Sequence, residues 1–247
     1  MTAALSLANV CKAFGGLRAV DDVTFDVQPG ERRVLIGPNG AGKTSLFHCI
    51  SGALLPTSGR ITCFGEDVTR LAEHKRTALG VGRTFQISSV FNELTVFENL
   101  AAASLGVTAA KWSWWRPVGS MPGVAERAKE ELQRVGLAGL EGQLVKHLSY
   151  GQRRQLELAL ALINRPRLLL LDEPCAGLSP AERVRLSGIV RALPPSITMV
   201  MIEHDMDVAL RLADRVSVLH RGRIILEGTS SEVSANPQVR EVYFGQV

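Results

Sequence analysis

The sequence has little of what would set it apart from ordinary globular proteins. Only 5% of its residues are aromatic, and no apolar run approaches the roughly 20 residues that cross a bilayer. Its four cysteines, at positions 11, 49, 63 and 175, do not have metal-ligand spacing, and we expect no disulfide framework. The five histidines form no ligand pair. Neither a structural zinc site nor a membrane-spanning segment is therefore expected.

Neither positive nor negative charge predominates in the sequence. Lys and Arg outnumber Asp and Glu by 28 to 24, and no long run of like charges occurs. A scattered net charge of +4 favours an ordinary solvated surface over a nucleic-acid partner. The first residues lack a basic segment followed by a long apolar one, so no secretory signal is expected. We expect a protein that is made and kept in the cytoplasm.

Apolar residues make up 46% of the 247 residues, which is enough for a buried core. Apolar periodicity predicts strands alternating with helices. The expected strands lie near 5–10, 23–27, 33–36, 61–64, 168–171 and 197–202, with a hairpin over 216–226. The expected helices are 44–52, 92–105, 124–135, 152–163 and 181–193. This alternation is typical of an α/β fold with a mainly parallel sheet.

The helix-rich middle of the chain interrupts the sheet pattern. We expect residues 1–88 and 159–247 to form a sheet-containing core with an antiparallel portion. Residues 89–158 would form an inserted helical subdomain. An irregular excursion near 105–127 includes Trp112, Trp114 and Trp115. The whole chain is then one domain.

A glycine-rich string follows the short apolar run at 33–36. It reads Gly37-Pro38-Asn39-Gly40-Ala41-Gly42-Lys43-Thr44, followed by Ser45. It matches GxxxxGK followed by Ser or Thr at every fixed position. The glycines let successive N–H groups face a phosphate, and the next helix turns its positive end toward it. We expect Lys43 to contact the β and γ phosphates of ATP and Thr44 to bind Mg²⁺.

Two acidic residues follow an all-leucine run. Leu168 to Leu171 predict a buried strand, and Asp172 and Glu173 emerge at its carboxyl end. In an open α/β sheet that edge binds the ligand. Successive strand residues point in different directions, so Asp172 can face Mg²⁺ while Glu173 faces the attacking water as general base. Two adjacent acids are otherwise usually a solvated surface pair.

The string Leu148-Ser149-Tyr150-Gly151-Gln152 resembles the LSGGQ signature of ABC ATPases, with Tyr150 in place of the first Gly. The resemblance implies that Ser149, Gly151 and Gln152 of one subunit complete the ATP site of a second. Ser149 is also a helix N-cap candidate. A capped helix N-terminus is itself an anion site.

Further positions match that family one at a time. Gln86 resembles the glutamine that touches Mg²⁺ and senses the transmembrane partner, although a plain surface glutamine is the alternative. His204 resembles the histidine near the γ-phosphate. Phe14 resembles the aromatic residue that stacks on adenine, with a plain core residue as the alternative. One departure stands out: the family commonly has Asp where this chain has Ser179, which bears on how two subunits communicate.

The resemblance is most specific to ATPases of branched-chain amino-acid importers. It is carried by strings at 14–23, 82–86, 176–180, 202–206 and 242–245, and by Asn236-Pro237. It implies transmembrane permease subunits, a second ATPase subunit, an indirect link to a solute-binding protein and a place on the cytoplasmic side of the membrane. Importers of urea, short amides or aromatic acids share much of this pattern.

Other functions are tested against the same residues. A soluble ABC ATPase of DNA repair or translation would need a long coiled-coil insert or a second ATPase unit, and neither is present. An exporter ATPase fits the amino-acid-importer strings poorly. A regulatory module without turnover would not need Glu173.

Overall fold

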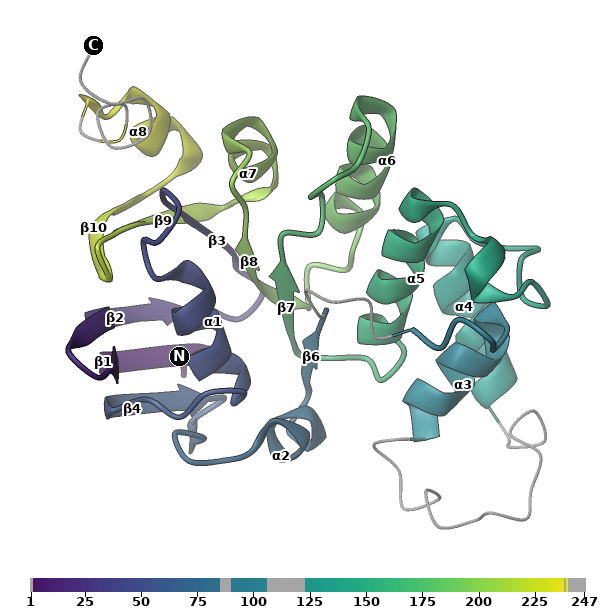
Figure 1. The fold of residues 1–247 in the computed structure, drawn as a ribbon, viewed down its shortest axis with the longest axis horizontal. Helices are drawn as coiled ribbons and strands as arrows, with labels where there is room; N and C mark the ends of the chain where they lie inside the picture. The colour runs from purple at the N-terminus through teal and green to yellow at the C-terminus, as the bar shows by residue number, and fades with distance from the viewer. Residues whose placement is uncertain (1, 85–89, 106–122, 238, 240–247) are drawn as a thin grey trace. The chain divides into compact units, whose positions relative to one another are not determined.

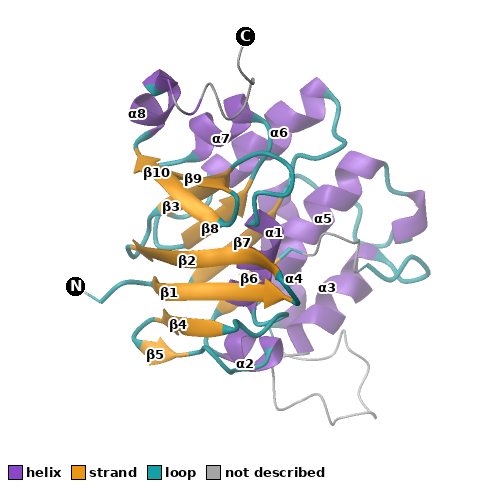
Figure 2. Ribbon diagram, turned by 60° about the vertical axis from the view of Figure 1, so that its left-hand side comes forward, coloured by secondary structure: helices purple, strands orange, loops and turns teal. Residues whose placement is uncertain are grey.

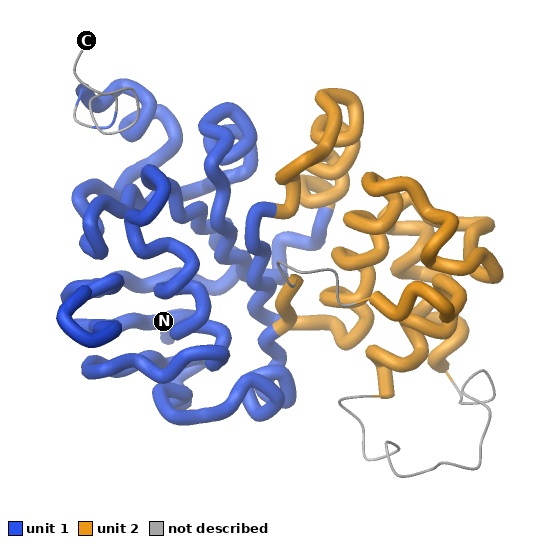
Figure 3. Tube along the Cα trace, in the orientation of Figure 1, with its two compact units in different colours: residues 1–81, 167–173, 193–247 blue, residues 82–166, 174–192 orange. Residues whose placement is uncertain are grey.

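The computed structural model describes residues 2–84, 90–105, 123–237 and 239 (Figure 1). Gln86, the three Trp residues at 112–115 and the string at 242–245 lie outside the described residues. Contacts divide the chain into two compact units (Figure 3). Unit 1 comprises residues 1–81, 167–173 and 193–247, and unit 2 comprises 82–166 and 174–192. The segment 174–192 thus groups with the helices, whereas the sequence assigned it to the core.

Unit 1 contains two sheets (Figure 2). The first has the order β2-β1-β4-β5 and is antiparallel throughout. Its strands are β1 (Leu5–Phe14), β2 (Leu17–Val27), β4 (Ser58–Cys63) and β5 (Glu66–Asp67). The second has the order β10-β9-β3-β8-β7-β6, and its strands from β9 to β7 run parallel. The predicted α/β class with an antiparallel portion is confirmed.

The second sheet is built from β3 (Arg32–Ile36), β6 (Val81–Arg83), β7 (Leu168–Asp172), β8 (Thr198–Ile202), β9 (Arg215–His220) and β10 (Arg223–Gly228). The chain passes from unit 1 to unit 2 within β6. Its inner strands are apolar on both faces, as expected of a parallel sheet that is covered on both sides. All five residues of β7 and of β8 are buried. β9 and β10 pair as the predicted hairpin.

Helix α1 (Lys43–Ser51) contacts strands of both sheets, including β2 and β7. Its buried residues Leu46, Phe47 and Ile50 belong to the main core, together with Leu35 of β3. The helix that begins at the phosphate loop is therefore fixed by the core on both sides. Unit 1 also contains α2 (Glu73–Ala78), α7 (Met206–Leu212) and α8 (Ser230–Ala235), which the sequence analysis did not predict.

Unit 2 is helical. It contains α3 (Val96–Leu105), α4 (Val124–Val135), the 3-10 turn η3 (Val145–His147), α5 (Tyr150–Leu162) and α6 (Pro180–Arg191). The first helix was predicted from residue 92 but begins at Val96. The reason is Thr95, whose hydroxyl accepts from the Glu98 N–H at 3.1 Å while the Glu98 carboxylate accepts from the Thr95 N–H at 2.7 Å. This reciprocal cap starts the helix.

Within the described residues, no helix is both long enough and apolar enough to span a bilayer.

Candidate nucleotide-binding site

The predicted phosphate loop lies where the sequence requires it, between the end of β3 and the first turn of α1. Gly37 and Gly42 both have positive φ, 152° and 100°. A Cβ at Gly37 would lie 2.2 Å from the Leu219 carbonyl oxygen, and one at Gly42 would lie 2.1 Å from that of Ala19. Backbone from two other segments therefore presses on the loop, and only glycine fits at these two positions.

Lys43 is buried and its ammonium lies inside the loop. Its Nζ donates to the carbonyl oxygens of Gly37 at 2.6 Å and Pro38 at 3.0 Å. Burial lowers the pKa of Lys43, and the nearby carboxylates of Glu173 and Asp172 oppose that shift. A positive charge is thus held at the centre of the loop with both predicted acids close to it.

A cleft of about 520 Å³ opens over the loop. Its lining includes the predicted residues Phe14, Asn39, Gly40, Ala41, Gly42, Lys43, Thr44, Ser45 and Glu173. Phe14 leaves 48% of its surface exposed, so it is not the plain core residue that was the alternative. Lys12 Nζ lies 5.1 Å from the centroid of its ring, and the exposed part of the ring can stack on a planar ligand.

Two cations at the cleft were missed by the sequence analysis. Arg18 is the second residue of β2, and Arg221 lies in the turn between β9 and β10 with φ 48°. The turn is held against the loop, because the Gly222 N–H donates to the Ala41 carbonyl at 2.9 Å. The only signal was the Arg221-Gly222 hairpin turn, which carries no phosphate motif. Both cations add positive charge to a cleft suited to an anion.

The two acids stand at the carboxyl end of β7. Asp172 is 2% exposed and is the last residue of the strand, in register with Ile202 of β8. Glu173 follows with φ 47°, a conformation that a non-glycine residue seldom adopts. Its N–H donates to the Ile202 carbonyl at 3.0 Å, which holds the strained turn in place. Such strain is concentrated at functional sites.

His204 comes to the same place from β8. Its Nδ1 lies 3.7 Å from Glu173 Oε2, and both side chains are partly exposed. The two residues are 31 positions apart in the sequence and meet because β7 and β8 end at the same edge. The structure thus brings together Lys43, Asp172, Glu173 and His204 within unit 1.

The donor chemistry of this edge fits a magnesium ion. Thr44 offers a hydroxyl and Asp172 a carboxylate, which are hard oxygen ligands. Among the described residues no group of three His, Cys, Asp or Glu could hold a metal by itself. Mg²⁺ is usually held by one or two carboxylates together with the phosphates of a nucleotide, and a donor set of Thr44 and Asp172 is of that kind.

The predicted signature residues lie in unit 2, at the start of α5. Ser149 is the N-cap: its Oγ accepts from the Gln152 N–H at 3.2 Å, and Gln152 Oε1 accepts from the Ser149 N–H at 2.9 Å. Gly151 donates its N–H to the Glu182 carboxylate. A Cβ at Gly151 would lie 2.3 Å from Glu182 Oε1. The helix start already holds one carboxylate, which shows its preference for an anion.

Ser179, the departure from the family pattern, has a structural role. It is the N-cap of α6, with its hydroxyl donating to Glu182 Oε2 at 2.6 Å and Pro180 following in the first turn. These hydrogen bonds lower the pKa of Glu182 and keep it ionised. Ser179 thus fixes the carboxylate that contacts Gly151.

A cleft that holds a phosphate loop and a strained glutamate, with a buried aspartate directly before that glutamate, defines a P-loop ATPase. The family model described as ABC transporter matches residues 20–176. Together with the similarities below, this shows that the chain belongs to the ABC transporter family, as one of its ATP-binding and ATP-hydrolysing cassettes. A second model, described as branched-chain amino acid ATP-binding cassette transporter, matches residues 223–247.

The chain is also similar to individual proteins of this family. It is 36% identical over 249 residues to the high-affinity branched-chain amino acid transport ATP-binding protein BraF of Pseudomonas aeruginosa, and the match covers 98% of each chain. A crystal structure of the ADP conformation of an ATP-binding cassette of an ABC transporter matches with a TM-score of 0.89, 31% identity and full coverage of both chains. A dimeric cassette in a post-hydrolysis state, bound to ADP and Pi, matches with a TM-score of 0.78 and 25% identity over 92% of this chain and 98% of that one.

Proposed function

We propose that this chain powers an importer of branched-chain amino acids, or of a related small solute, by binding and hydrolysing ATP in the cleft of unit 1. The observation that carries the proposal is that Lys43 and Glu173 line one cleft above a phosphate loop, with His204 3.7 Å from Glu173. The similarity to BraF over 98% of each chain supports the solute class. Importers of urea, short amides or aromatic acids are the alternative within the family.

Each residue has a definite task. The loop N–H groups and Lys43 bind the phosphates and offset their charge. Phe14 stacks on the base of the nucleotide. Glu173 accepts a proton from the attacking water as general base. His204, whose Nδ1 lies 3.7 Å from Glu173 Oε2, orients the γ-phosphate. Thr44, Asp172 and the predicted Gln86 would hold Mg²⁺, which neutralises charge on the phosphates when bound.

We propose further that two ATPase subunits share each nucleotide, in a homodimer or a heterodimer. The helix start at Ser149, Gly151 and Gln152 offers the Ser149 hydroxyl to a phosphate of a second subunit, and the Gly151 N–H can exchange the Glu182 carboxylate for that phosphate. The similarity to a dimeric cassette supports this arrangement. Binding of ATP would close the dimer, and hydrolysis would open it.

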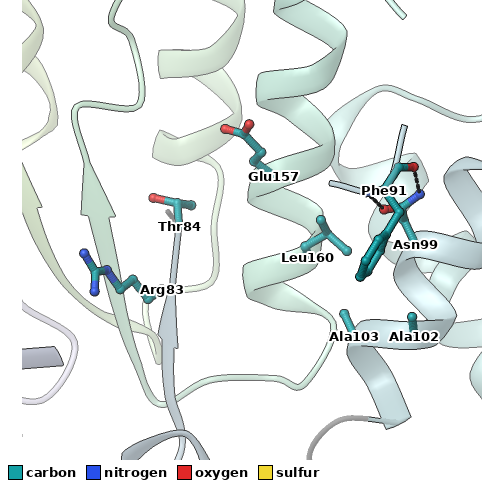
Figure 4. A pocket seen from close by; sticks show the side chains of 8 residues that line it. All are labelled: Arg83, Thr84, Phe91, Asn99, Ala102, Ala103, Glu157 and Leu160. Carbon is teal, nitrogen blue, oxygen red and sulfur yellow. Dashed lines mark hydrogen bonds between the residues drawn. The ribbon is translucent and has the colours of Figure 1, made fainter. Parts of the chain in front are cut away.

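The partner in the membrane would be a permease, which places the subunit on the cytoplasmic side. Unit 2 contains a cavity of about 370 Å³, shown in Figure 4. Phe91, at its mouth, is 61% exposed. Asn99 holds the backbone of Phe91 at both ends, accepting from its N–H at 2.8 Å and donating to its carbonyl at 3.1 Å. An exposed apolar side chain on a fixed backbone beside a cavity suits a docking helix of the permease.

The test is uptake of labelled leucine by vesicles that contain the permease, the solute-binding protein and this subunit. Wild type should support uptake, and Lys43→Ala should abolish it together with ATP binding. Val90→Glu with Phe91→Glu should keep ATP binding but lose both uptake and co-purification with the permease. Val184→Glu, at an apolar residue of α6 that is 68% exposed, is the matched control.

Two results would overturn the proposal. ATP-independent uptake, or full uptake with Lys43→Ala, would remove the ATPase role. Uptake of urea, a short amide or an aromatic acid in place of leucine would assign the chain to the alternative solute class.

A further inference from the structure

Tyr150 makes a contact that a glycine at this position could not make. It is the first residue of α5, and 47% of its surface is exposed. Its hydroxyl donates to the Ala176 carbonyl at 3.1 Å. Gly177 has φ 73°, and a Cβ there would lie 3.1 Å from the same hydroxyl. The segment 174–178, which follows Glu173 directly in the chain, therefore rests on this tyrosine.

Arg154, one turn further along α5, fixes the tyrosine from the other side. Its Nε and Nη2 donate to the Tyr150 hydroxyl at 3.2 and 2.9 Å, and its guanidinium lies 5.3 Å from the ring centroid. Its Nη1 donates to Glu157 Oε2 at 2.9 Å. Burial opposes the charge of Arg154, but Glu157 and the tyrosine outweigh it and raise the pKa of Arg154. The arginine is thus a permanent cation between two oxygen partners.

Glu157 connects the hydrogen bonds of Tyr150 and Arg154 to the cavity. It is only 6% exposed and lines the cavity together with Leu160 and Phe91 (Figure 4). Four groups are therefore joined in sequence within unit 2: the cavity wall at Glu157, the Arg154 guanidinium, the Tyr150 hydroxyl and the Ala176 carbonyl. No residue of this path belongs to the phosphate cleft.

We propose that Tyr150 and Arg154 are positioning residues that transmit occupancy of the cavity to the segment after Glu173, so that docking of the permease stimulates ATP hydrolysis. The inference rests on the proposed function. A docked helix excludes water from the cavity and lowers the dielectric around Glu157, which strengthens its attraction for Arg154. The guanidinium shares its donors between Glu157 and Tyr150, so a change at one partner changes the other. A shift of the Ala176 carbonyl then moves the segment 174–178, and this movement brings the adjoining Glu173 into position.

The test separates basal from permease-stimulated ATP hydrolysis. Tyr150→Phe removes only the hydroxyl. It should leave the ATP affinity and basal turnover of the isolated subunit within about twofold of wild type. In vesicles with the permease it should lower the stimulated kcat at least fivefold with KM for ATP unchanged, while the permease still binds. Loss of a purely structural contact would instead lower the melting temperature and basal turnover together.

Two further variants test the same series of contacts. Arg154→Gln and Glu157→Gln should each lower the stimulated kcat as Tyr150→Phe does, and the double variant Tyr150→Phe with Arg154→Gln should lose no more than either single one. Arg153→Gln is the matched control, because Arg153 donates to the Lys146 carbonyl at 3.0 Å and lies next to Arg154 in the sequence. It should keep full stimulation.

The inference is overturned if Tyr150→Phe retains full stimulation, if Arg153→Gln loses as much as Arg154→Gln, or if the double variant loses the product of the two single effects. Failure of the proposed function is distinct from all three. In that case wild type itself would show neither ATP hydrolysis nor stimulation by the permease.

Discussion

Glu173, the proposed general base, has a strained backbone conformation. Its backbone has φ 47°, which costs about 1–3 kcal/mol and persists only where the surroundings enforce it. Here the enforcing contact is the hydrogen bond from its N–H to Ile202. The strain turns the chain away from the strand direction directly after Asp172. Glu173 is then free to line the cleft while Asp172 stays buried.

Replacing Glu173 with Gln should separate binding from turnover. The amide keeps the size of the side chain but cannot accept the proton from water. We expect turnover to fall at least ~10²-fold, the lower end for loss of a general base, while ATP still binds. Steady-state hydrolysis and an ATP titration measure the two effects. Lys43→Ala is the contrasting variant and should lose affinity as well, and turnover near wild type in Glu173→Gln would move the base to another residue.

At this scale the sequence predicted local motifs and missed long-range partners. The phosphate loop and the two acids after β7 depend on residues close together in the chain, and each lies where it was predicted. The contacts of Tyr150 with Ala176 and of Gly151 with Glu182 join positions 26 and 31 residues apart, and no local pattern reports them. Arg18 and Arg221 reach the cleft only because two separate turns meet there.

At the scale of elements, α1 depends on a buried arginine at its carboxyl end. Arg76 is completely buried. Its Nη1 donates to the carbonyl oxygens of Cys49 at 2.8 Å and Ile50 at 2.7 Å, and its Nε donates to that of Leu71 at 3.0 Å. A cation at the negative end of a helix is favourable, and here it also satisfies carbonyls in the last turn. The phosphate loop is at the other end of this helix.

Arg76→Met should therefore destabilise the protein strongly. The side chain keeps its apolar length, but four carbonyl oxygens lose a donor, and two of those hydrogen bonds are buried. We expect a loss of about 2–5 kcal/mol in the free energy of unfolding, because each buried carbonyl oxygen left without a donor costs about 1–3 kcal/mol. Urea denaturation measures it. Lys75→Met, at the exposed neighbouring position of α2, is the control and should change the free energy by less than about 0.5 kcal/mol. An equal effect of the two variants would contradict the role of Arg76.

The strands and the long helices were predicted, and the short helices were not. The parallel strands are short apolar runs, and α4 and α5 have enough turns to show helical periodicity. Helices α2, α7 and α8 have only six or seven residues, too few for a period to be recognised. Their ends are set by caps such as Thr229, whose hydroxyl accepts from the Glu232 N–H at 3.3 Å.

At the scale of the whole molecule, two buried thiols link stability to pH. Burial raises the pKa of Cys49 and of Cys63 from 9.0 to about 11. Between these values the unfolded chain releases both protons while the folded chain keeps them, so stability falls as pH rises. By pH 10 each thiol should cost about 1.4 kcal/mol relative to pH 8. Urea denaturation at both pH values of wild type and of Cys49→Ala with Cys63→Ala measures the difference. Parallel losses in the two proteins would contradict it.

The last prediction concerns assembly, because the proposed site is incomplete in one copy. The cleft over Lys43 and the helix start at Ser149 belong to different units, and ATP would join the cleft of one subunit to the helix start of another. The isolated subunit should be weakly dimeric. Glu173→Gln, which cannot complete hydrolysis, should accumulate a dimer with ATP and Mg²⁺ and return to monomer with ADP. Sizing chromatography under the two conditions distinguishes these states.

Ser149→Arg in the Glu173→Gln background should prevent that dimer. The arginine removes a hydroxyl that caps α5, which costs about 1 kcal/mol and leaves the protein folded. It also places a bulky side chain where the phosphate of the second subunit must approach the N–H groups of the helix. Ser58→Arg, at an exposed serine of β4, adds the same charge elsewhere and should leave the dimer intact. Circular dichroism would verify folding in both. A dimer that forms equally well with Ser149→Arg, or a single oligomeric state with ATP and with ADP, would show that the nucleotide is not shared through α5.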